Sequence, residues 1–165
     1  MGRAALLATG LVLGGCSAVA PAPVPTPQAQ PPAPPAACLL DGAALGATTG
    51  ITWTPDQSTA TDTRCVYDPP GSPGPAGFLA VDVSTSTDDA ATQLDTIAQL
   101  CVSGSRADVD AADGGFTCRY DGSNLYAAMV RGDQLVTISS SAVPAGTTAA
   151  KLALGLTEQL TRIGA

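Results

Sequence analysis

The hydrophobic and polar positions of this chain follow two different periods, which predict helices and strands. Apolar residues recur at steps of three and four in some segments, the pattern of an amphipathic helix with one buried face. The predicted helices cover residues 39–47, 90–101 and 148–163. Elsewhere apolar and polar residues alternate, or turn residues bound short apolar runs, as expected for strands. The predicted strands cover residues 51–54, 64–67, 77–86, 115–121, 124–132 and 134–141.

The order of these elements predicts an α+β domain built on an antiparallel sheet. The last three strands are joined only by the turn sequences "YDGSN" and "RGDQ", in which glycine permits the positive φ of tight turns. We expect about five to six strands covered by two to three helices, which bury the apolar face of the sheet. This domain is expected to occupy residues 38–165, a length typical of one domain.

The N-terminal residues 1–15 have the features of an export signal. Arg3 supplies a positive charge, and the apolar run that follows it is shorter than the roughly 20 residues that span a membrane. The sequence "LGGC", which ends at Cys16, resembles the lipobox of bacterial lipoproteins. This resemblance implies cleavage before Cys16 and a diacylglyceryl membrane anchor, with palmitate as an acyl chain, on its thiol. The alternative is an ordinary secretory signal in which Cys16 has no role.

A proline-rich segment follows the lipobox and is expected to act as a tether. Eight prolines fall among alanine, valine and glutamine in residues 17–37. Proline fixes φ and lacks an N–H donor, so the segment favours extended polyproline II at about 3.1 Å per residue. Lipidated Cys16 and the tether together make up residues 16–37, which would let the domain stand up to ~60 Å from a membrane. A PxxP ligand for a partner domain is the alternative.

The acidic charge of the chain argues against two classes of binding partner. The chain carries a formal net charge of −7 with a sequence pI near 4.1, and its seven basic residues are scattered. Nucleic acids and anionic lipid surfaces bind proteins through clustered Lys and Arg side chains, so neither is expected as a direct partner. Because only six residues are aromatic, the core must consist largely of aliphatic side chains and would benefit from covalent cross-links.

Four cysteines remain once Cys16 is assigned to the lipid, and they predict two disulfides. An even number of cysteines in an exported chain is typical of disulfide bonding, but three pairings are possible and spacing alone does not choose. The segments "RCVYDPPGS" and "TCRYDGSNL" share a Cys-x-Tyr-Asp sequence followed by turn residues, and each has a cysteine before it near a predicted helix. If the two halves are structurally equivalent, the pairs are Cys38–Cys65 and Cys101–Cys118.

Composition and motifs argue against an enzyme. The chain contains no histidine, so nucleophile–base pairs that depend on imidazole cannot be built. Thr148-x-x-Lys151 only loosely resembles the Ser-x-x-Lys motif of penicillin-recognising enzymes, and the first turn of a helix is the preferred interpretation. No Gly-rich nucleotide motif is present. We expect no catalytic residues and no cofactor.

An Asp-rich segment superficially resembles a calcium-binding loop. Asp108, Asp110 and Asp113 precede Gly114, but the third acid comes one residue late and Arg119 stands where the loop requires Glu. The spacing therefore predicts a solvated turn and no metal site.

Three side chains are the candidates for ligand binding. Trp53 lies in a short predicted strand that runs into a polar loop, so it could line a cleft, although a place in the core is preferred. Tyr67 ends the next predicted strand. Met129 lies on the apolar face of "NLYAAMVRG", where small neighbours could leave room for a ligand or let a helix pack closely.

Several features together resemble the small cell-wall lipoproteins of actinobacteria, many of which carry domains of unknown function. These features are the lipobox, the Pro/Ala tether, "ACLLDGAALGA", the Cys-x-Tyr strand and the closing "KLALGLTEQLTRI" helix. The resemblance implies a lipid-anchored protein on the outer face of the cytoplasmic membrane, facing the cell wall, and supplies no catalytic residues.

We expect a non-catalytic binding or interaction module whose partner is an envelope protein. The alternative is a carrier or chaperone for a lipid or another apolar envelope molecule. An apolar cavity of several hundred Å³ would favour the carrier. A filled core with an exposed apolar patch would favour the interaction module.

The substitution Cys16→Ser should remove the lipid anchor, because serine has no thiol to accept the diacylglyceryl group. When cells that express the protein are fed an alkyne-bearing palmitate, the original chain should carry the label and the variant should not. Ser17→Ala changes the next residue and should keep the label. A labelled Cys16→Ser variant would contradict the lipobox assignment.

Overall fold

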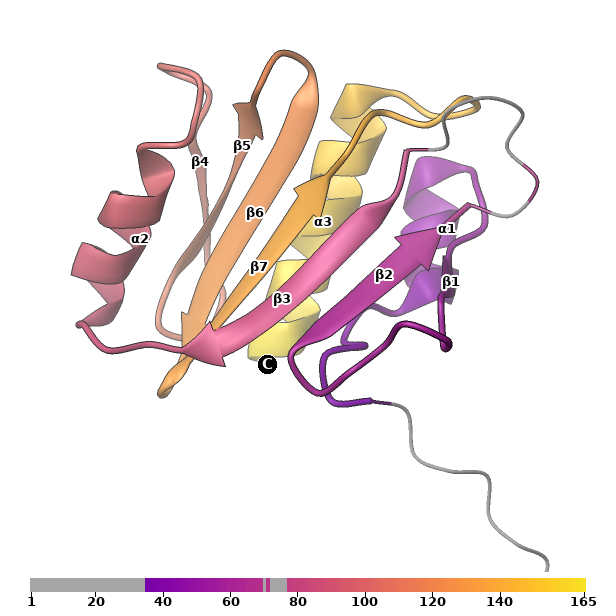
Figure 1. The fold of residues 1–165 in the computed structure, drawn as a ribbon. Helices are drawn as coiled ribbons and strands as arrows, with labels where there is room; N and C mark the ends of the chain where they lie inside the picture. Colours follow the sequence, from indigo (N-terminus) through magenta and orange to yellow (C-terminus); the bar gives the residue numbers. More distant parts are fainter. Residues whose placement is uncertain (1–34, 70, 72–76) are drawn as a thin grey trace, which may run out of the picture. The chain divides into compact units, whose positions relative to one another are not determined.

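Seven strands form one antiparallel sheet in the computed structural model, in the order β1-β2-β3-β7-β6-β5-β4 (Figure 1). The strands are β1 (Thr54–Pro55), β2 (Arg64–Asp68), β3 (Leu79–Thr85), β4 (Ala107–Val109), β5 (Gly115–Tyr120), β6 (Asn124–Arg131) and β7 (Gln134–Ser140). The structure describes residues 35–69, 71 and 77–165, so the predicted signal peptide, Cys16 and the tether up to residue 34 lie outside the described residues.

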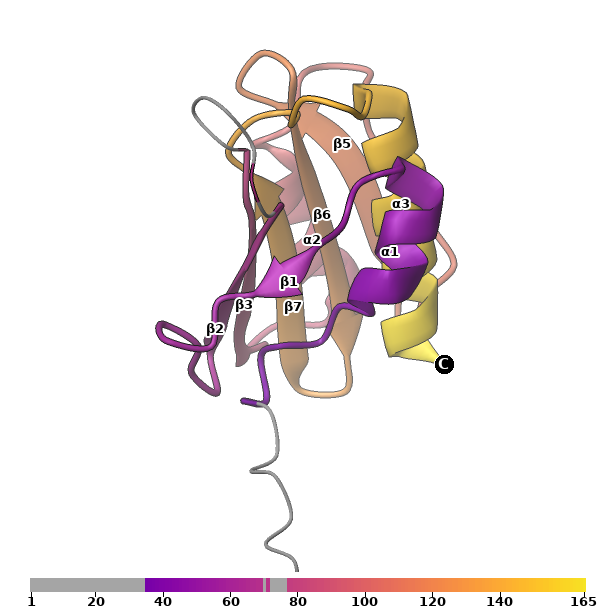
Figure 2. The same ribbon diagram turned by 90° about the vertical axis from the view of Figure 1, so that its right-hand side faces the viewer.

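The two faces of the sheet are covered unequally. Helices α1 (Gly42–Thr49) and α3 (Ala149–Gly164) lie side by side on one face (Figure 2). Helix α2 (Ala90–Ala98) lies on the opposite face, where it packs against β5 and β6. Within the described ranges, Figure 1 shows no helix on that second face over β7, β3 and β2.

The predicted α+β class is confirmed, but the sheet has seven strands rather than about five to six. The strand that the sequence missed is β4, which pairs with β5 from Ala107↔Thr117 to Val109↔Gly115. Three residues are too few to show alternation, and β4 lies inside the segment expected to be a turn. Its strand conformation follows from pairing with β5 rather than from its own sequence.

Helix α1 begins three residues later than its apolar pattern predicts, because Asp41 caps it. The Asp41 carboxylate accepts hydrogen bonds from the N–H groups of Ala43 and Ala44 at 3.1 and 3.0 Å. At the other end Gly50 adopts a φ of 81°, a left-handed conformation that glycine adopts without strain. Thr148 caps α3 in the same way by accepting a bond from the Lys151 N–H at 3.2 Å, so Thr148-x-x-Lys151 is a helix start.

The main core fills the space between the sheet and the pair α1 and α3. The side chains of this cluster are below 9% exposed and include Leu45, Tyr67, Leu79, Val81, Met129, Val136, Ile138, Leu152, Leu156 and Leu160. A second, smaller cluster lies under α2 and consists of Leu94, Phe116, Cys118, Ala128, Val130 and Leu135. Burial of each large apolar side chain contributes roughly 1.5–3 kcal/mol, so the main core carries most of the stability.

Helix α1 is short and is held in place by α3. A Cβ added to Gly155 would lie 2.8 Å from Leu45 Cδ1, which shows how closely the two helices approach. The fully buried Gln159 joins their ends, because its Oε1 accepts a hydrogen bond from the Asp41 N–H at 2.8 Å and its Nε2 donates one to the Asp41 carbonyl at 3.3 Å. These contacts satisfy buried polar groups that would otherwise destabilise the helix start.

Both predicted disulfides are confirmed. Cys38–Cys65 has a Cα–Cα distance of 5.1 Å and joins the segment before α1 to β2. Cys101–Cys118 has a Cα–Cα distance of 5.7 Å and joins the segment after α2 to β5. Each bond therefore connects the chain next to a helix with a strand of the sheet, as the internal similarity of the two halves predicts.

Replacing Cys101 and Cys118 together by alanine should lower the free energy of unfolding by about 3 kcal/mol, because the bond closes a loop with a sequence separation of 17. Replacing Cys38 and Cys65 should cost slightly more, since their separation is 27. Urea unfolding followed by circular dichroism measures both losses. Ser103→Ala, at an exposed turn, is the control and should change stability by less than about 0.5 kcal/mol. A loss below about 1 kcal/mol for either pair would show that the bond contributes little.

Candidate functional site

The three side chains singled out for ligand binding are buried in the main core. Trp53, Tyr67 and Met129 are 3%, 1% and 0% exposed. The indole Nε1 of Trp53 donates a hydrogen bond to the Thr49 hydroxyl at 3.0 Å. The Tyr67 hydroxyl accepts a bond from the Leu40 N–H at 3.0 Å, and burial raises the pKa of this phenol. These side chains support packing, and Trp53 occupies the core position that the sequence analysis preferred.

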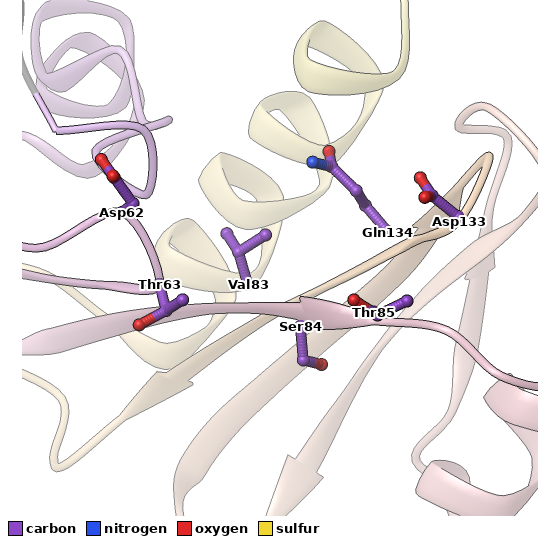
Figure 3. A pocket seen from close by; sticks show the side chains of 7 residues that line it. All are labelled: Asp62, Thr63, Val83, Ser84, Thr85, Asp133 and Gln134. Carbon is purple, nitrogen blue, oxygen red and sulfur yellow. The ribbon is translucent and has the colours of Figure 1, made fainter.

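A hollow of about 400 Å³ lies at the end of β3, and we call it the polar hollow (Figure 3). Its lining residues are Asp62, Thr63, Val83, Ser84, Thr85, Asp133 and Gln134. Figure 3 shows Asp62, Val83 and Gln134 rising from one side of the sheet, whereas Ser84 points to the opposite side. Val83 is the one aliphatic side chain of the seven, so the lining suits a polar rather than an apolar molecule.

The polar hollow lies beside the point where the chain enters the domain. The Asp62 carboxylate accepts a hydrogen bond from the Ala36 N–H at 3.2 Å. At its other side Gln134 Oε1 accepts a bond from Arg131 Nη2 at 3.0 Å. Its carboxylates and hydroxyls are exposed, and the chain has no histidine to form a nucleophile–base pair with them. The groups present can hydrogen-bond a ligand and offer no general base of the imidazole type.

A smaller hollow of about 270 Å³ between α2 and β4 contains Arg106. Its guanidinium forms salt bridges with Asp95 and Asp108, both at 2.8 Å. The guanidinium carbon lies 5.0 Å from the ring centroid of Phe116, which is a cation–π contact. The hydrogen bond with Asp95 is the largest cause that raises the pKa of Arg106, and the bond with Asp108 adds to it. Arg106 therefore fastens the edge strand β4 to α2.

The Asp-rich segment does not assemble a metal site. Asp108 lies in β4 and is paired with Arg106, whereas Asp113 accepts a hydrogen bond from the Gly132 N–H at 2.6 Å. Across the described part of the chain, no three His, Cys, Asp or Glu side chains gather closely enough to hold a metal ion.

Part of one face of the sheet is left uncovered by α2, and the sequence did not predict this surface. We call it the open sheet face. Strand alternation places on it Arg64, Val66, Asp68, Ala80, Asp82, Tyr120, Tyr126, Thr137 and Ser139, of which Ala80 is buried at 2% exposure. Phe78 precedes β3 and continues the same alternation, and its carbonyl accepts a hydrogen bond from the Ser141 N–H. One row across the strands runs from Val66 through Ala80 and Ser139 to Tyr126. Leu79 and Val81, which alternate with these positions, point into the main core.

Three of the six aromatic side chains of the protein lie on the open sheet face. The rings of Tyr120 and Tyr126 meet edge to face, with centroids 5.8 Å apart. Phe78 is 37% exposed, which is high for phenylalanine. Burial, and to a smaller extent the charge of Asp82, raises the pKa of Tyr126, against a hydrogen bond with Thr137 that lowers it. In the register of the sheet, Asp82 pairs with Thr137, and Tyr126 pairs with Ser139 two residues further along β7.

Helix α2 and the residues after it border the open sheet face. Ile97 packs on the smaller core, and Leu100, just beyond the helix, is 57% exposed. Val102 follows the disulfide-bonded Cys101 and is 37% exposed. Its N–H donates to the Arg119 carbonyl at 2.8 Å, so this apolar border is fixed to β5.

One signal in the sequence could have revealed this surface. The three predicted helices are too few to cover both faces of the predicted sheet, and α2 has only 9 residues. What the sequence could not show is the strand order, which places β2 and β3 on the far side of β7 from α2.

Searches with protein-family models, curated proteins and solved structures found no match to this chain. None of the helices in the described ranges has both the length and the apolar character needed to cross a membrane.

Because Trp53 is the only tryptophan, its fluorescence reports directly on one core position. Iodide should quench this fluorescence several-fold less in the folded protein than in urea, since the side chain is 3% exposed. Stern–Volmer plots in both conditions measure the difference. Free tryptophan in the same two solutions serves as the control for the effect of urea. Equal quenching would place the indole at the surface and reopen a binding role for Trp53.

Proposed function

We propose that this protein is a lipid-anchored, non-catalytic interaction module of the cell envelope. In this proposal Cys16 carries the anchor, the proline-rich tether spaces the domain from the outer face of the cytoplasmic membrane, and the open sheet face binds an envelope protein. The observation that carries the proposal is this face, where Phe78 is exposed and Val66, Tyr120 and Tyr126 are half-buried beside a filled core.

The composition of the open sheet face supports protein binding. Tyrosine, phenylalanine and arginine are enriched at protein interfaces, and hydroxyl side chains supply adaptable hydrogen bonds. The face combines Tyr126 and Phe78 with Thr137, Ser139 and Arg64. Exposed apolar patches bordered by polar residues commonly mark interaction sites.

The position of this face relative to the start of the domain also supports the proposal. The chain enters beside Asp62, just before β2 begins, as the bond from the Ala36 N–H shows. Phe78 lies at the opposite end of the sheet, because β3 runs antiparallel to β2 and Leu79 pairs with Tyr67. The aromatic end of the face therefore lies away from the point where the chain enters the domain.

The carrier alternative has less support from the packing. The space between the sheet and the two helices α1 and α3 is occupied by large side chains, among them Tyr67 and Met129 on the sheet and Leu152, Leu156 and Leu160 on α3. The polar hollow has a lining suited to polar groups. Neither feature offers an apolar lipid the enclosed site that such ligands usually occupy.

Photo-cross-linking in living cells tests the proposal. The photoreactive amino acid p-benzoylphenylalanine, placed at Phe78 in an actinobacterial host, should form an adduct with an envelope protein on illumination. The matched control carries the same group at Leu154, which is 55% exposed on α3, in the opposite layer. We expect an adduct from position 78 and none from position 154.

Two outcomes would contradict the proposal. Adducts from position 154 alone would move the binding surface to the helical layer. A lipid-sized mass bound to the purified protein in native mass spectrometry, without adducts from position 78, would favour the carrier. Cys16→Ser in the same cells separates loss of binding from loss of the anchor.

A further inference from the structure

We propose that the open sheet face docks a basic segment of the partner protein, with Asp68 and Asp82 binding its Lys or Arg side chains and the nearby aromatic rings stacking on them. This inference rests on the proposed interaction function and specifies the chemistry of the partner.

Charge complementarity is the first argument. All fourteen acidic side chains and six of the seven basic ones lie between residues 41 and 162, so this part of the chain carries a formal charge of −8. An acidic domain attracts basic partners and repels acidic ones over distances of about a Debye length. Of the described residues, Arg64 is the one basic side chain on the open sheet face, and it is already paired with Asp82.

The pair between Arg64 and Asp82 can be exchanged for a contact with a partner. Arg64 Nη1 lies 2.8 Å from Asp82 Oδ1, and the two side chains are 54% and 42% exposed. Exposed pairs of this kind contribute little to stability, so their replacement by an intermolecular pair costs little. Asp68, at the end of the same strand as Arg64, adds a second carboxylate to the face.

The molecule already contains an arginine held in the way we propose. Arg106 is bound by two carboxylates, Asp95 and Asp108, while its guanidinium lies over the ring of Phe116. The open sheet face offers the same kinds of group, carboxylates and aromatic rings, at its surface. On this face Asp82 pairs with Thr137 of β7, and Tyr126 pairs with Ser139, two residues further along the same strand, so the carboxylate and the ring are diagonal neighbours across β7. A cation placed between them gains both Coulombic and cation–π energy.

A defined peptide tests the inference on the full-length protein in detergent. The probe is a fluorescent eight-residue peptide of alternating arginine and glycine, and the same peptide with glutamate is the negative control. Fluorescence anisotropy should show binding of the arginine peptide that weakens with added salt, and no binding of the glutamate peptide.

Matched variants distinguish the open sheet face from general attraction to an acidic protein. Asp82→Asn and Asp68→Asn should each weaken binding by about fivefold, and the second leaves the Arg64 pair intact. Asp95→Asn removes a carboxylate that is likewise 2.8 Å from an arginine, but beside β4, and should change binding less than about twofold. Phe78→Ser should weaken binding and Leu154→Ser should not. Circular dichroism of every variant confirms that it is folded.

Several results would overturn the inference. The inference is wrong if the arginine peptide does not bind. If Asp95→Asn weakens binding as much as Asp82→Asn does, the overall charge of the protein explains the binding and the open sheet face does not. Sequencing the peptide cross-linked at position 78 in cells separates this inference from the proposed function. A cross-linked peptide without Lys or Arg would refute the basic partner and keep the interaction module, whereas no adduct would refute both.

Discussion

The pairing of β3 with β7 joins the two halves of the sheet and decides which side chains lie inside the domain. Seven residues of each strand are in register, so Leu79 and Val81 face the helices while Ala80 and Asp82 face the opposite way. A slip of one residue would bury Asp82 and expose the leucine, which costs the burial energy of a whole row of side chains. Because β2 and the β5–β6 pair extend from these two strands, the position of every other side chain on the sheet depends on this register.

The elements at the periphery need additional bonds because they bury little surface of their own. Helix α1 has 8 residues, too few to be stable alone, and it is held by Cys38–Cys65, the Gln159 contacts and close packing on α3. Helix α2 is held in the same manner by Cys101–Cys118 and by Arg106. The covalent bonds compensate for a modest aliphatic core.

The small number of helices leaves part of the sheet uncovered. Three helices suffice to cover one face of the sheet and part of the other, and the uncovered part carries aromatic, hydroxyl and charged groups instead of a continuous apolar run. The sheet ends in strands of two and three residues, which offer almost no free edge for pairing with another chain. For the proposed interaction module, recognition would therefore fall to the face of the sheet.

Patterns that are local in the sequence determined most of the architecture. The helical period and the strand alternation are set by neighbouring residues, so they predict three helices, six of the seven strands and the α+β class. The repeated Cys-x-Tyr-Asp sequence similarly predicts both disulfides. In contrast, β4 exists only through its pairing with β5, and the burial of Met129 on β6 depends on α3, a helix later in the sequence. The open sheet face was decided by tertiary structure alone, because strand order and helix placement are long-range contacts that no local period records.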